Sequence, residues 1–394
     1  MRRPPRLLAV SNGHGEDDIA VKVLEALARR RKIDIDAWAV VGAGDAYRAR
    51  DIPLTGPGSH MPSEGFGTLS LKMFWRDLRG GFLATSWRQL RHAAAIRGRY
   101  DLLLGVGDVV PLLAAWASAT PMAFVACAKS AYYVELDGHT PLERRLMRRR
   151  CAAVFPRDQR TADGFAARSV PCQYLGNPMM DGLGESDDIW PLEGDQVGVV
   201  MLAGSRQDAT ENALFLLDAA GRLAERAGPQ MRFLFPVHPS VDLARLDGAP
   251  GWRRSDGQAA LTLAHTGGAR AEFEQGRLGA MLRSGTVAVG LAGTANEQAI
   301  GLGLPLITLP GLGNQGDAYV RMKMAYFGEA AVAVPRNPER VAEELGRLMA
   351  DPDRQLRMRS AGRERMGHPG ASDAIAEWMD GWFEENGFGG GDVV

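Results

Sequence analysis

The sequence contains few cysteines and no long hydrophobic run. Only three of its 394 residues are cysteines, Cys127, Cys151 and Cys172, and their spacing fits no metal site. An odd number of thiols in so long a chain is typical of a reducing cytoplasm and argues against a disulfide-rich secreted protein. No stretch approaches the roughly 20 apolar residues of a membrane-spanning helix. The basic start, MRRPPRLLAV, has an apolar run too short for a signal peptide.

The chain also lacks a strong net charge. Its formal charge is −1, which gives no indication of nucleic-acid binding. The charge is unevenly placed, because residues 1–180 hold 26 Lys and Arg against 17 Asp and Glu, whereas the remainder holds 20 against 30. A basic half joined to an acidic half predicts that the basic half meets an anionic surface. We therefore expect a cytoplasmic protein, either soluble or peripheral on the inner face of the cell membrane.

Short apolar runs alternate with helical segments along most of the chain, starting with RLLAV at 6–10. Such alternation indicates parallel βαβ units. It is interrupted at 174–195 by YLGNPMMDGLGESDDIWPLEGD, which is rich in Gly, Pro and Asp. A chain of 394 residues is too long for one ordinary core. We therefore predict two α/β domains, at 1–183 and 184–369, followed at 370–394 by a helix that packs back on the N-terminal domain and a flexible tail.

The first glycine-rich loop, SNGHGED at 11–17, follows a predicted strand. Ligands of such sheets bind beyond the strand carboxyl ends, where helix N-termini present free N–H groups. His14 is a candidate general base, because its pKa lies near neutrality. Alternatively the loop is a tight turn in which Asp17 or Asp18 caps the next helix. Three further residues of this loop are candidates for substrate binding: Gly13, Gly15 and Glu16.

A second candidate for the chemistry is Asp108, at the end of the predicted strand YDLLLGVGD. The carboxyl ends of neighbouring parallel strands share one edge of the sheet, so we expect Asp108 to face the same site as the first loop. It could be a base or could orient one. Alternatively it only caps the helix that starts near Pro111.

In the second half, the segment MLAGSRQDATEN at 201–212 joins a predicted strand to a helix. Gly204 and Ser205 form a compact loop, and Arg206 can bind a phosphate through two charge-assisted hydrogen bonds. The helix N-terminus adds partial positive charge, so we predict a diphosphate site. The same segment also predicts a capping box between Asp208 and Glu211, and both interpretations can hold together.

The segment GLAGTANEQAIGLGLPLITLP at 290–310 supports two interpretations. The spacing of Thr294 and Glu297 fits a capping box. Alternatively Gly290 and Gly293 leave space for a ligand against the backbone, with Thr294 beside it, and Glu297 accepts hydrogen bonds from ribose hydroxyls.

The following loop, LPGLGNQGDAYV, supplies Asn314 and Gln315. Their neutral amides both donate and accept hydrogen bonds and suit the hydroxyls of a sugar. The sequence has no Asp-x-Asp motif beside a strand, since DID at 34–36 lies within one. We therefore expect no metal and no cofactor.

The segment at 68–99, TLSLKMFWRDLRGGFLATSWRQLRHAAAIRGR, combines apolar residues at helical spacing with basic residues between them. A helix of this kind can lie in a membrane interface. The basic run ERRLMRRR at 143–150 could join the same surface. Alternatively the segment forms a pair of surface helices that pack on the core through their apolar residues, which are Leu71, Phe74, Trp75, Leu78, Leu83, Trp87, Leu90 and Ala94.

Several of these segments resemble one known family. LAGSR, GLAGTANEQAIGLGLPLI, LPGLGNQ and YLGNPMMD resemble lipid-A-disaccharide synthase, most sharply at 201–212 and 290–320. SNGHGED is similar to the N-terminal loop of the peptidoglycan N-acetylglucosaminyltransferase. SNGHGEDDIA is more similar to synthase-related proteins than to the synthases, which have a Ser/Glu-rich loop there. The resemblance implies the glycosyltransferase-B fold, in which two Rossmann-like domains face each other across a cleft and bind the acceptor and the nucleotide sugar, respectively.

The resemblance also implies an activity. It is that of an inverting, metal-independent glycosyltransferase that moves an N-acetylglucosamine-type sugar from a UDP-sugar to a lipid-linked or membrane-associated acceptor. Glu297 would hold the ribose, Arg206 the diphosphate, and His14 or Asp108 would take the proton of the acceptor hydroxyl. One alternative is a hydrolysing UDP-sugar 2-epimerase, which needs several carboxylates near the sugar ring, whereas the ones expected there are few: Glu16, Asp108 and Glu297. The other is a catalytically silent nucleotide-sugar-binding protein.

Overall fold

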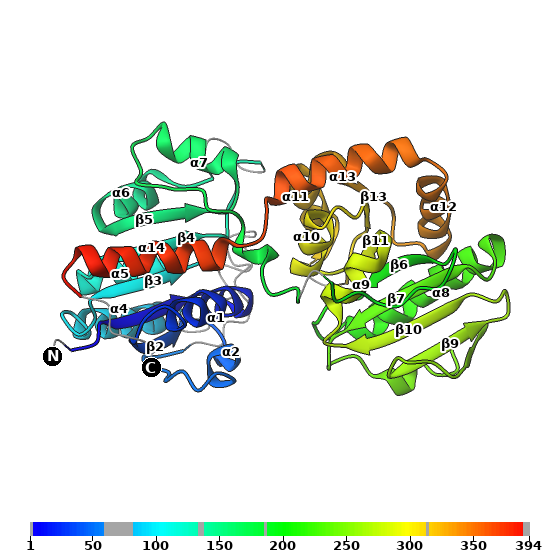
Figure 1. Ribbon diagram of the computed structural model, residues 1–394, viewed down its shortest axis with the longest axis horizontal. Helices are drawn as coiled ribbons and strands as arrows, with labels where there is room; N and C mark the ends of the chain where they lie inside the picture. Colours follow the sequence, from blue (N-terminus) through cyan, green and yellow to red (C-terminus); the bar gives the residue numbers. More distant parts are fainter. Residues whose placement is uncertain (1–2, 59–81, 133–137, 185–186, 313–314, 389–394) are drawn as a thin grey trace. The chain divides into compact units, whose positions relative to one another are not determined.

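The computed structural model describes residues 3–58, 82–132, 138–184, 187–312 and 315–388. The chain divides into two α/β units, each built on its own sheet (Figure 1). The first consists of Met1–Asp181 and His368–Val394, and the second of Gly182–Gly367. The predicted domain ranges, 1–183 and 184–369, differ from these units by two residues at each boundary. The roles assigned to the two domains stay predictions.

The first unit contains a five-stranded parallel sheet of order β2-β1-β3-β4-β5. Every residue of β3 and β4 is buried, as expected for a parallel sheet covered on both faces. The strands that follow β1 in the chain are added first on one side of it (β2) and then on the other (β3 to β5), so the strand order reverses between β1 and β3. Ligands of such folds bind at this reversal, beyond the strand carboxyl ends. The strands are β1 Arg6–Ser11, β2 Asp34–Ala39, β3 Leu102–Val106, β4 Met122–Ala126 and β5 Cys151–Pro156.

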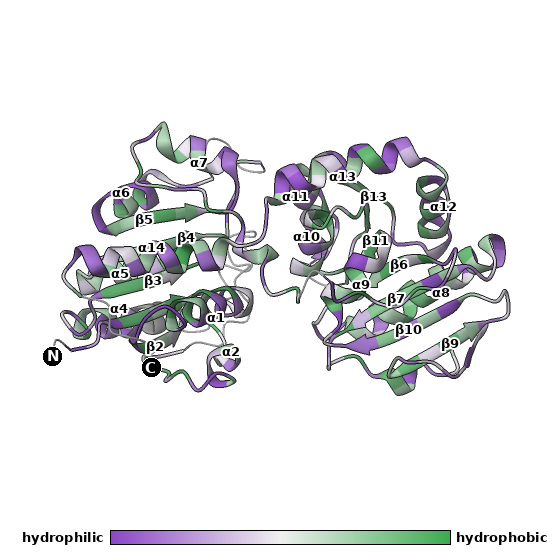
Figure 2. Ribbon diagram, in the orientation of Figure 1, coloured by the Kyte–Doolittle hydropathy of each residue, from purple (hydrophilic) through white to green (hydrophobic). Residues whose placement is uncertain are grey.

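Alternate strand residues pack against helices on the two faces of this sheet. One face is covered by α1 His14–Ala28, α2 Asp45–Arg48 and α14 Ala371–Glu385. The other is covered by α4 Phe82–Ala95, α5 Val109–Ser118, α6 Pro141–Arg150 and α7 Gln159–Ala166. Figure 2 shows the hydrophobic residues concentrated on β3, β4 and β5.

The C-terminal helix α14 packs against α1, as the sequence predicts. Arg31 joins them: its side chain is buried and donates hydrogen bonds to the backbone carbonyls of Asp380 (3.0 Å) and Phe388 (2.7 Å). The guanidinium also lies 5.0 Å from the centre of the Phe383 ring. The predicted flexible tail, from residue 389, lies outside the described residues.

The second unit contains an eight-stranded sheet of order β13-β12-β11-β6-β7-β10-β9-β8. Its pairs are parallel except for those that β9 makes with β10 and β8. The strand order reverses between β6 and β11, because β7 to β10 lie on one side of β6 and β11 to β13 on the other. The loops after β6 and β11 therefore flank the expected ligand position. The strands are β6 Val197–Leu202, β7 Met231–Val237, β8 Trp252–Arg254, β9 Leu261–His265, β10 Arg270–Gln275, β11 Gly285–Gly290, β12 Leu306–Thr308 and β13 Ala331–Ala333.

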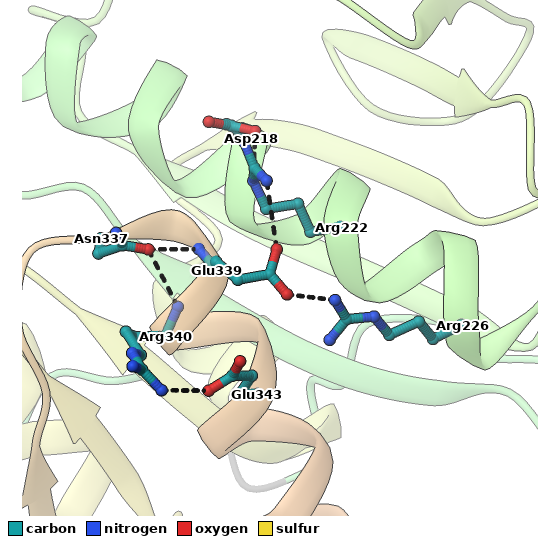
Figure 3. A network of polar contacts seen from close by, with 7 residues as sticks. All are labelled: Asp218, Arg222, Arg226, Asn337, Glu339, Arg340 and Glu343. Atoms are coloured by element: carbon teal, nitrogen blue, oxygen red, sulfur yellow. Dashed lines mark hydrogen bonds and ion pairs between the residues drawn. The ribbon is translucent and has the colours of Figure 1, made fainter.

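A polar network joins two helices of the second unit (Figure 3). The Glu339 carboxylate accepts hydrogen bonds from Arg222 (3.2 Å) and Arg226, and the Asn337 side chain caps the helix by accepting from the Glu339 and Arg340 backbone N–H groups. The network joins α8 Ala209–Ala227 to α12 Pro338–Met349, although exposed ion pairs contribute little stability. The helices are α8 Ala209–Ala227, α9 Leu278–Ser284, α10 Thr294–Gly301, α11 Asp317–Phe327, α12 Pro338–Met349 and α13 Pro352–Met366.

The predicted basic, aromatic segment at 68–99 is described only from residue 82 onward. In α4, Ala93 and the nearby Ile96 are buried, whereas Trp87 and Ala94 are exposed. The prediction that Trp87 and Ala94 face the core is therefore wrong, whereas Leu90 of the same predicted stripe is partly buried. None of the described helices is long and apolar enough to cross a membrane.

Candidate functional site

In the first unit, the loops after β1 and β3 lie side by side. The two strands pair in parallel, with Ser11 opposite Val106. Beyond them the Asn12 side-chain amide donates a 2.9 Å hydrogen bond to Asp108 Oδ1. Gly107 has φ +128, and a Cβ placed on it would lie 3.4 Å from Glu16 Cγ. The sheet therefore brings together two of the predicted site residues, Glu16 and Asp108, at its carboxyl edge.

Asp108 caps a helix as well as facing this edge. It is the N-cap of α5, and its Oδ1 accepts a 3.0 Å hydrogen bond from the Val110 N–H. The capping interpretation is therefore confirmed. Burial raises the pKa of Asp108, while the hydrogen bond from Val110 and the positive charge of Lys129 oppose that rise. A carboxylate of raised pKa is a stronger proton acceptor than an ordinary aspartate, so capping and base catalysis are compatible.

The helix after β1 begins earlier than the sequence predicts. It starts at His14, with Gly13 as an N-cap that offers no side-chain bond, so the prediction that Asp17 or Asp18 caps it is wrong. Gly13 has φ 170, an extended conformation open to any residue. Gly15 is exposed in the first turn. The side chain of His14 lies outside the described part of the chain.

Asp17 instead points into the first unit. Its Oδ1 accepts a 2.5 Å hydrogen bond from Ser11 Oγ, which also contacts the Tyr47 hydroxyl at 2.7 Å. All three side chains are at most 1% exposed. Burial raises the pKa of Asp17 to about 7, and the charges of neighbouring acidic residues add to the rise. No local pattern predicts this cluster, because Tyr47 lies in a separate short helix, α2.

In the second unit, the loop after β6 contains Gly204, Ser205 and Arg206. Gly204 has φ +87, a left-handed conformation that favours glycine, and Ser205 and Arg206 are exposed. Asp208 is the N-cap of α8 but makes no side-chain cap bond, so the predicted capping box is wrong. Its expected partner, Glu211, binds Arg245 at 2.7 Å instead.

The loop after β7 contributes residues that the sequence reasoning missed. His238 follows the last residue of β7, and its Nδ1 lies 2.9 Å from Ser240 Oγ. Ser240 Oγ in turn donates a 3.3 Å hydrogen bond to the Ser205 carbonyl. His238 therefore stands beside the Gly204–Arg206 loop. Its position directly after an apolar strand was the signal that could have identified it.

Gly290, the last residue of β11, and Gly293, in the loop after it, have different surroundings. The Asn296 side chain occupies the space that a Cβ on Gly290 would need, so Gly290 serves packing and the ligand space predicted there is wrong. A Cβ on Gly293 would meet only the Tyr319 hydroxyl, at 3.7 Å. Thr294 is exposed and begins α10 without a side-chain cap bond, so the predicted capping box is wrong here too.

Glu297 binds a cation of the next helix. Its side chain is only 3% exposed, and Oε1 lies 2.5 Å from Lys323 Nζ in α11. The ammonium also lies 5.7–5.9 Å from the ring centres of Tyr319, Tyr326 and Phe327. A cation surrounded by a carboxylate and aromatic rings is electrostatically favourable in a poorly hydrated position. Lys323 was missed because it lies 26 residues after Glu297.

Gln315 is buried next to the same ion pair. It lines a cavity of about 10 Å³ together with Asn296, Thr308, Tyr319 and Lys323. This volume accommodates about one water molecule. Asn314, the other predicted sugar-binding amide, lies outside the described residues. The second unit thus gathers the predicted residues Gly293, Glu297 and Gln315 around the N-terminus of α10.

The carboxyl ends of β6 and β11 bring the two loops of the second unit into contact. A Cβ placed on Gly204 would lie 3.6 Å from the Leu291 carbonyl oxygen and 3.8 Å from Ala292 Cα. The Asn212 side-chain amide in α8 donates a 3.1 Å hydrogen bond to the Ala203 carbonyl, which links the loop after β6 to α8. The helix N-termini of α8 and α10 therefore flank one edge, which favours an anionic ligand. Among the described residues, no group of His, Cys, Asp and Glu has the arrangement of a metal site.

Comparison with known structures identifies the fold. The calicheamicin glycosyltransferase CalG4 matches with a TM-score of 0.66 and 14% identity over 98% of this chain and 100% of that chain. The S. aureus MnaA–UDP co-structure matches at 0.61 and 13% over 96% and 97%, and a putative UDP-N-acetylglucosamine 2-epimerase from Listeria monocytogenes at 0.59 and 15% over 100% of both. No family model and no curated protein matches the sequence. The chain therefore has the glycosyltransferase-B fold, with two Rossmann-like domains.

Proposed function

We propose that the protein is an inverting glycosyltransferase that uses a UDP-sugar of the N-acetylglucosamine type. The observation that supports this most is the edge of the second sheet, where the Gly204–Arg206 loop meets the loop that joins β11 to α10, at the reversal of strand order. Two helix N-termini, an exposed arginine and a buried carboxylate gathered there suit a diphosphate and a ribose. The fold is shared with a glycosyltransferase and with a protein solved with UDP, which supports the same donor class.

In this proposal each group of the edge binds one part of the donor. Arg206 and the N-termini of α8 and α10 hold the diphosphate, Glu297 accepts hydrogen bonds from the ribose hydroxyls, and Asn314 and Gln315 bind the sugar. Negative charge grows on the diphosphate as the sugar leaves. Donors that are already oriented stabilise that charge more in the transition state than in the ground state, as catalysis requires. These groups can do so without a metal ion.

The reaction we propose forms one bond and breaks one. The acceptor oxygen attacks the anomeric carbon from the face opposite the diphosphate, so the configuration inverts. The carbon–oxygen bond to the diphosphate breaks, and UDP leaves with its electron pair. The acceptor hydroxyl gives its proton to His14 or Asp108, of which the raised pKa suits Asp108 to the task.

We further propose a lipid-linked or membrane-associated acceptor. Trp87 on α4, Trp116 on α5 and Leu142 on α6 are 64%, 52% and 57% exposed, and α5 packs against both other helices. Large apolar residues among cations suit the interface of an anionic membrane. The exposed cations of α4 and α6 are Arg88, Arg91, Arg145, Arg148 and Arg149. Flotation with phosphatidylglycerol vesicles tests this: we expect binding that weakens in the Trp87→Ser/Trp116→Ser variant, and equal flotation of the two proteins would contradict it.

The activity is tested by supplying radiolabelled UDP-N-acetylglucosamine with a bacterial lipid extract. We expect label in the organic phase and release of UDP in equal amount, and neither in the Asp108→Ala/His14→Ala variant. No labelled lipid with any common UDP-sugar would contradict the transferase. Incubation without acceptor separates the alternative: UDP plus a free epimerised sugar would identify a hydrolysing 2-epimerase, a class to which four of the matched structures belong or are assigned.

A further inference from the structure

The buried ion pair between Glu297 and Lys323 belongs to a regular contact between two helices. Gly293, directly before α10, and Glu297, in its first turn, are four residues apart. Tyr319 and Lys323 are likewise four residues apart in α11. Gly293 faces the Tyr319 hydroxyl, and Glu297 binds Lys323. Residues four apart lie on one face of a helix, so α11 forms a wall along the first turn of α10.

The ion pair joins α10 to α11 and is not part of a helix cap, since the N-cap of α10 at Gly293 has no side-chain cap hydrogen bond. A carboxylate that is 3% exposed needs a partner, because an unpaired buried charge is strongly unfavourable. An apolar pair of similar volume would generally serve stability as well or better. A buried pair at the proposed donor site therefore points to recognition.

We propose that Lys323 is a positioning residue, which holds the Glu297 carboxylate in the orientation that accepts the two ribose hydroxyls of the nucleotide. The proposal rests on the proposed function. Lys323 Nζ is 2.5 Å from Oε1 and is surrounded by three rings, and its side chain is 18% exposed. With one oxygen fixed by the ammonium, the carboxylate plane cannot rotate freely. The ordering is then complete before the donor binds, which favours affinity and selectivity.

The geometry assigns Lys323 to the carboxylate and not to the diphosphate. The ammonium makes its short contact with Glu297 and lies among Tyr319, Tyr326 and Phe327. The exposed Arg206 is the cation suited to the diphosphate. Lys323 should thus affect ribose selectivity, while Arg206 should affect the binding of UDP relative to uridine.

Calorimetry with UDP and 2′-deoxy-UDP tests the proposal. A site built around a hydroxyl rejects the analogue that lacks it, so we expect the wild type to prefer UDP by tenfold or more. We expect both Lys323→Met and Glu297→Gln to reduce the preference below threefold, and Lys323→Arg to retain it. Thermal melting checks that each variant is folded.

The double variant Glu297→Gln/Lys323→Met carries no buried charge, so it remains informative if Lys323→Met alone does not fold. A residue that acts only through Glu297 adds nothing once Glu297 is changed. We therefore expect the double variant and Glu297→Gln to bind UDP within threefold of each other. A double variant more than tenfold weaker, or a folded Lys323→Met with wild-type preference, would overturn the proposal. A wild type that binds no UDP at millimolar concentration would instead remove the proposed function.

Discussion

Replacing Asp17 by asparagine is expected to remove a pH dependence from the stability of the first unit. Burial raises the pKa of Asp17 from 3.8 to about 7. The folded state therefore holds this proton more tightly than the unfolded chain does. The stability that the proton provides is fully present below pH 3.8 and is lost as the pH rises through about 7. Between pH 5 and pH 8 the loss amounts to about 2–3 kcal/mol.

Asparagine keeps the shape of the side chain and an oxygen that accepts from Ser11, but it does not titrate. The stability of the first unit is measured for each protein by urea unfolding at pH 5 and at pH 8. The probe of unfolding is the hydrogen exchange of a peptide from β1. We expect the wild type to lose about 2–3 kcal/mol more than Asp17→Asn over this range. The exposed neighbour offers a matched control, Asp18→Asn, which should keep the wild-type slope. Equal slopes for Asp17→Asn and the wild type would refute the reasoning.

Three further predictions concern separate parts of the chain. Arg206→Ala should lower kcat/KM by about tenfold or more with an unchanged melting temperature, since Arg206 is exposed, and unchanged kinetics would remove its role. Gly290→Ala should destabilise the second unit by about 1–3 kcal/mol in urea, because Asn296 fills the space, whereas Gly293→Ala should keep wild-type stability. Arg31→Met should cost about 2–4 kcal/mol and increase proteolysis within α14, and wild-type resistance would contradict the docking by Arg31.

The sequence predicts the fold well because the signal for parallel sheets is local. The runs that form β3 and β4 are apolar at every position and lie between segments of helical spacing. The Gly- and Pro-rich segment at 174–195 contains the observed boundary at Asp181. The phase of α4 was not predictable in this way, since apolar residues lie on both its buried and its exposed sides.

The details of the site were less predictable because distant residues compete with local ones. Thr294 and Glu297 have the spacing of a capping box, but the Glu297 carboxylate binds Lys323, 26 residues further on. Glu211 likewise binds Arg245, which is distant in the sequence. Capping patterns describe what a helix can do alone, and a buried or well-placed cation changes the outcome. Asp108 followed its local prediction because its capping partner, the Val110 N–H, is two residues away.

The most direct test of the account locates the donor. Hydrogen exchange with and without UDP-N-acetylglucosamine, followed by mass spectrometry, reports which backbone amides a ligand protects. We predict protection of 203–212 and 291–298, which are the loops after β6 and β11 with the first turns of α8 and α10, and smaller changes elsewhere in the second unit. Saturating donor that leaves both loops unprotected would contradict the claim that this edge binds a nucleotide sugar.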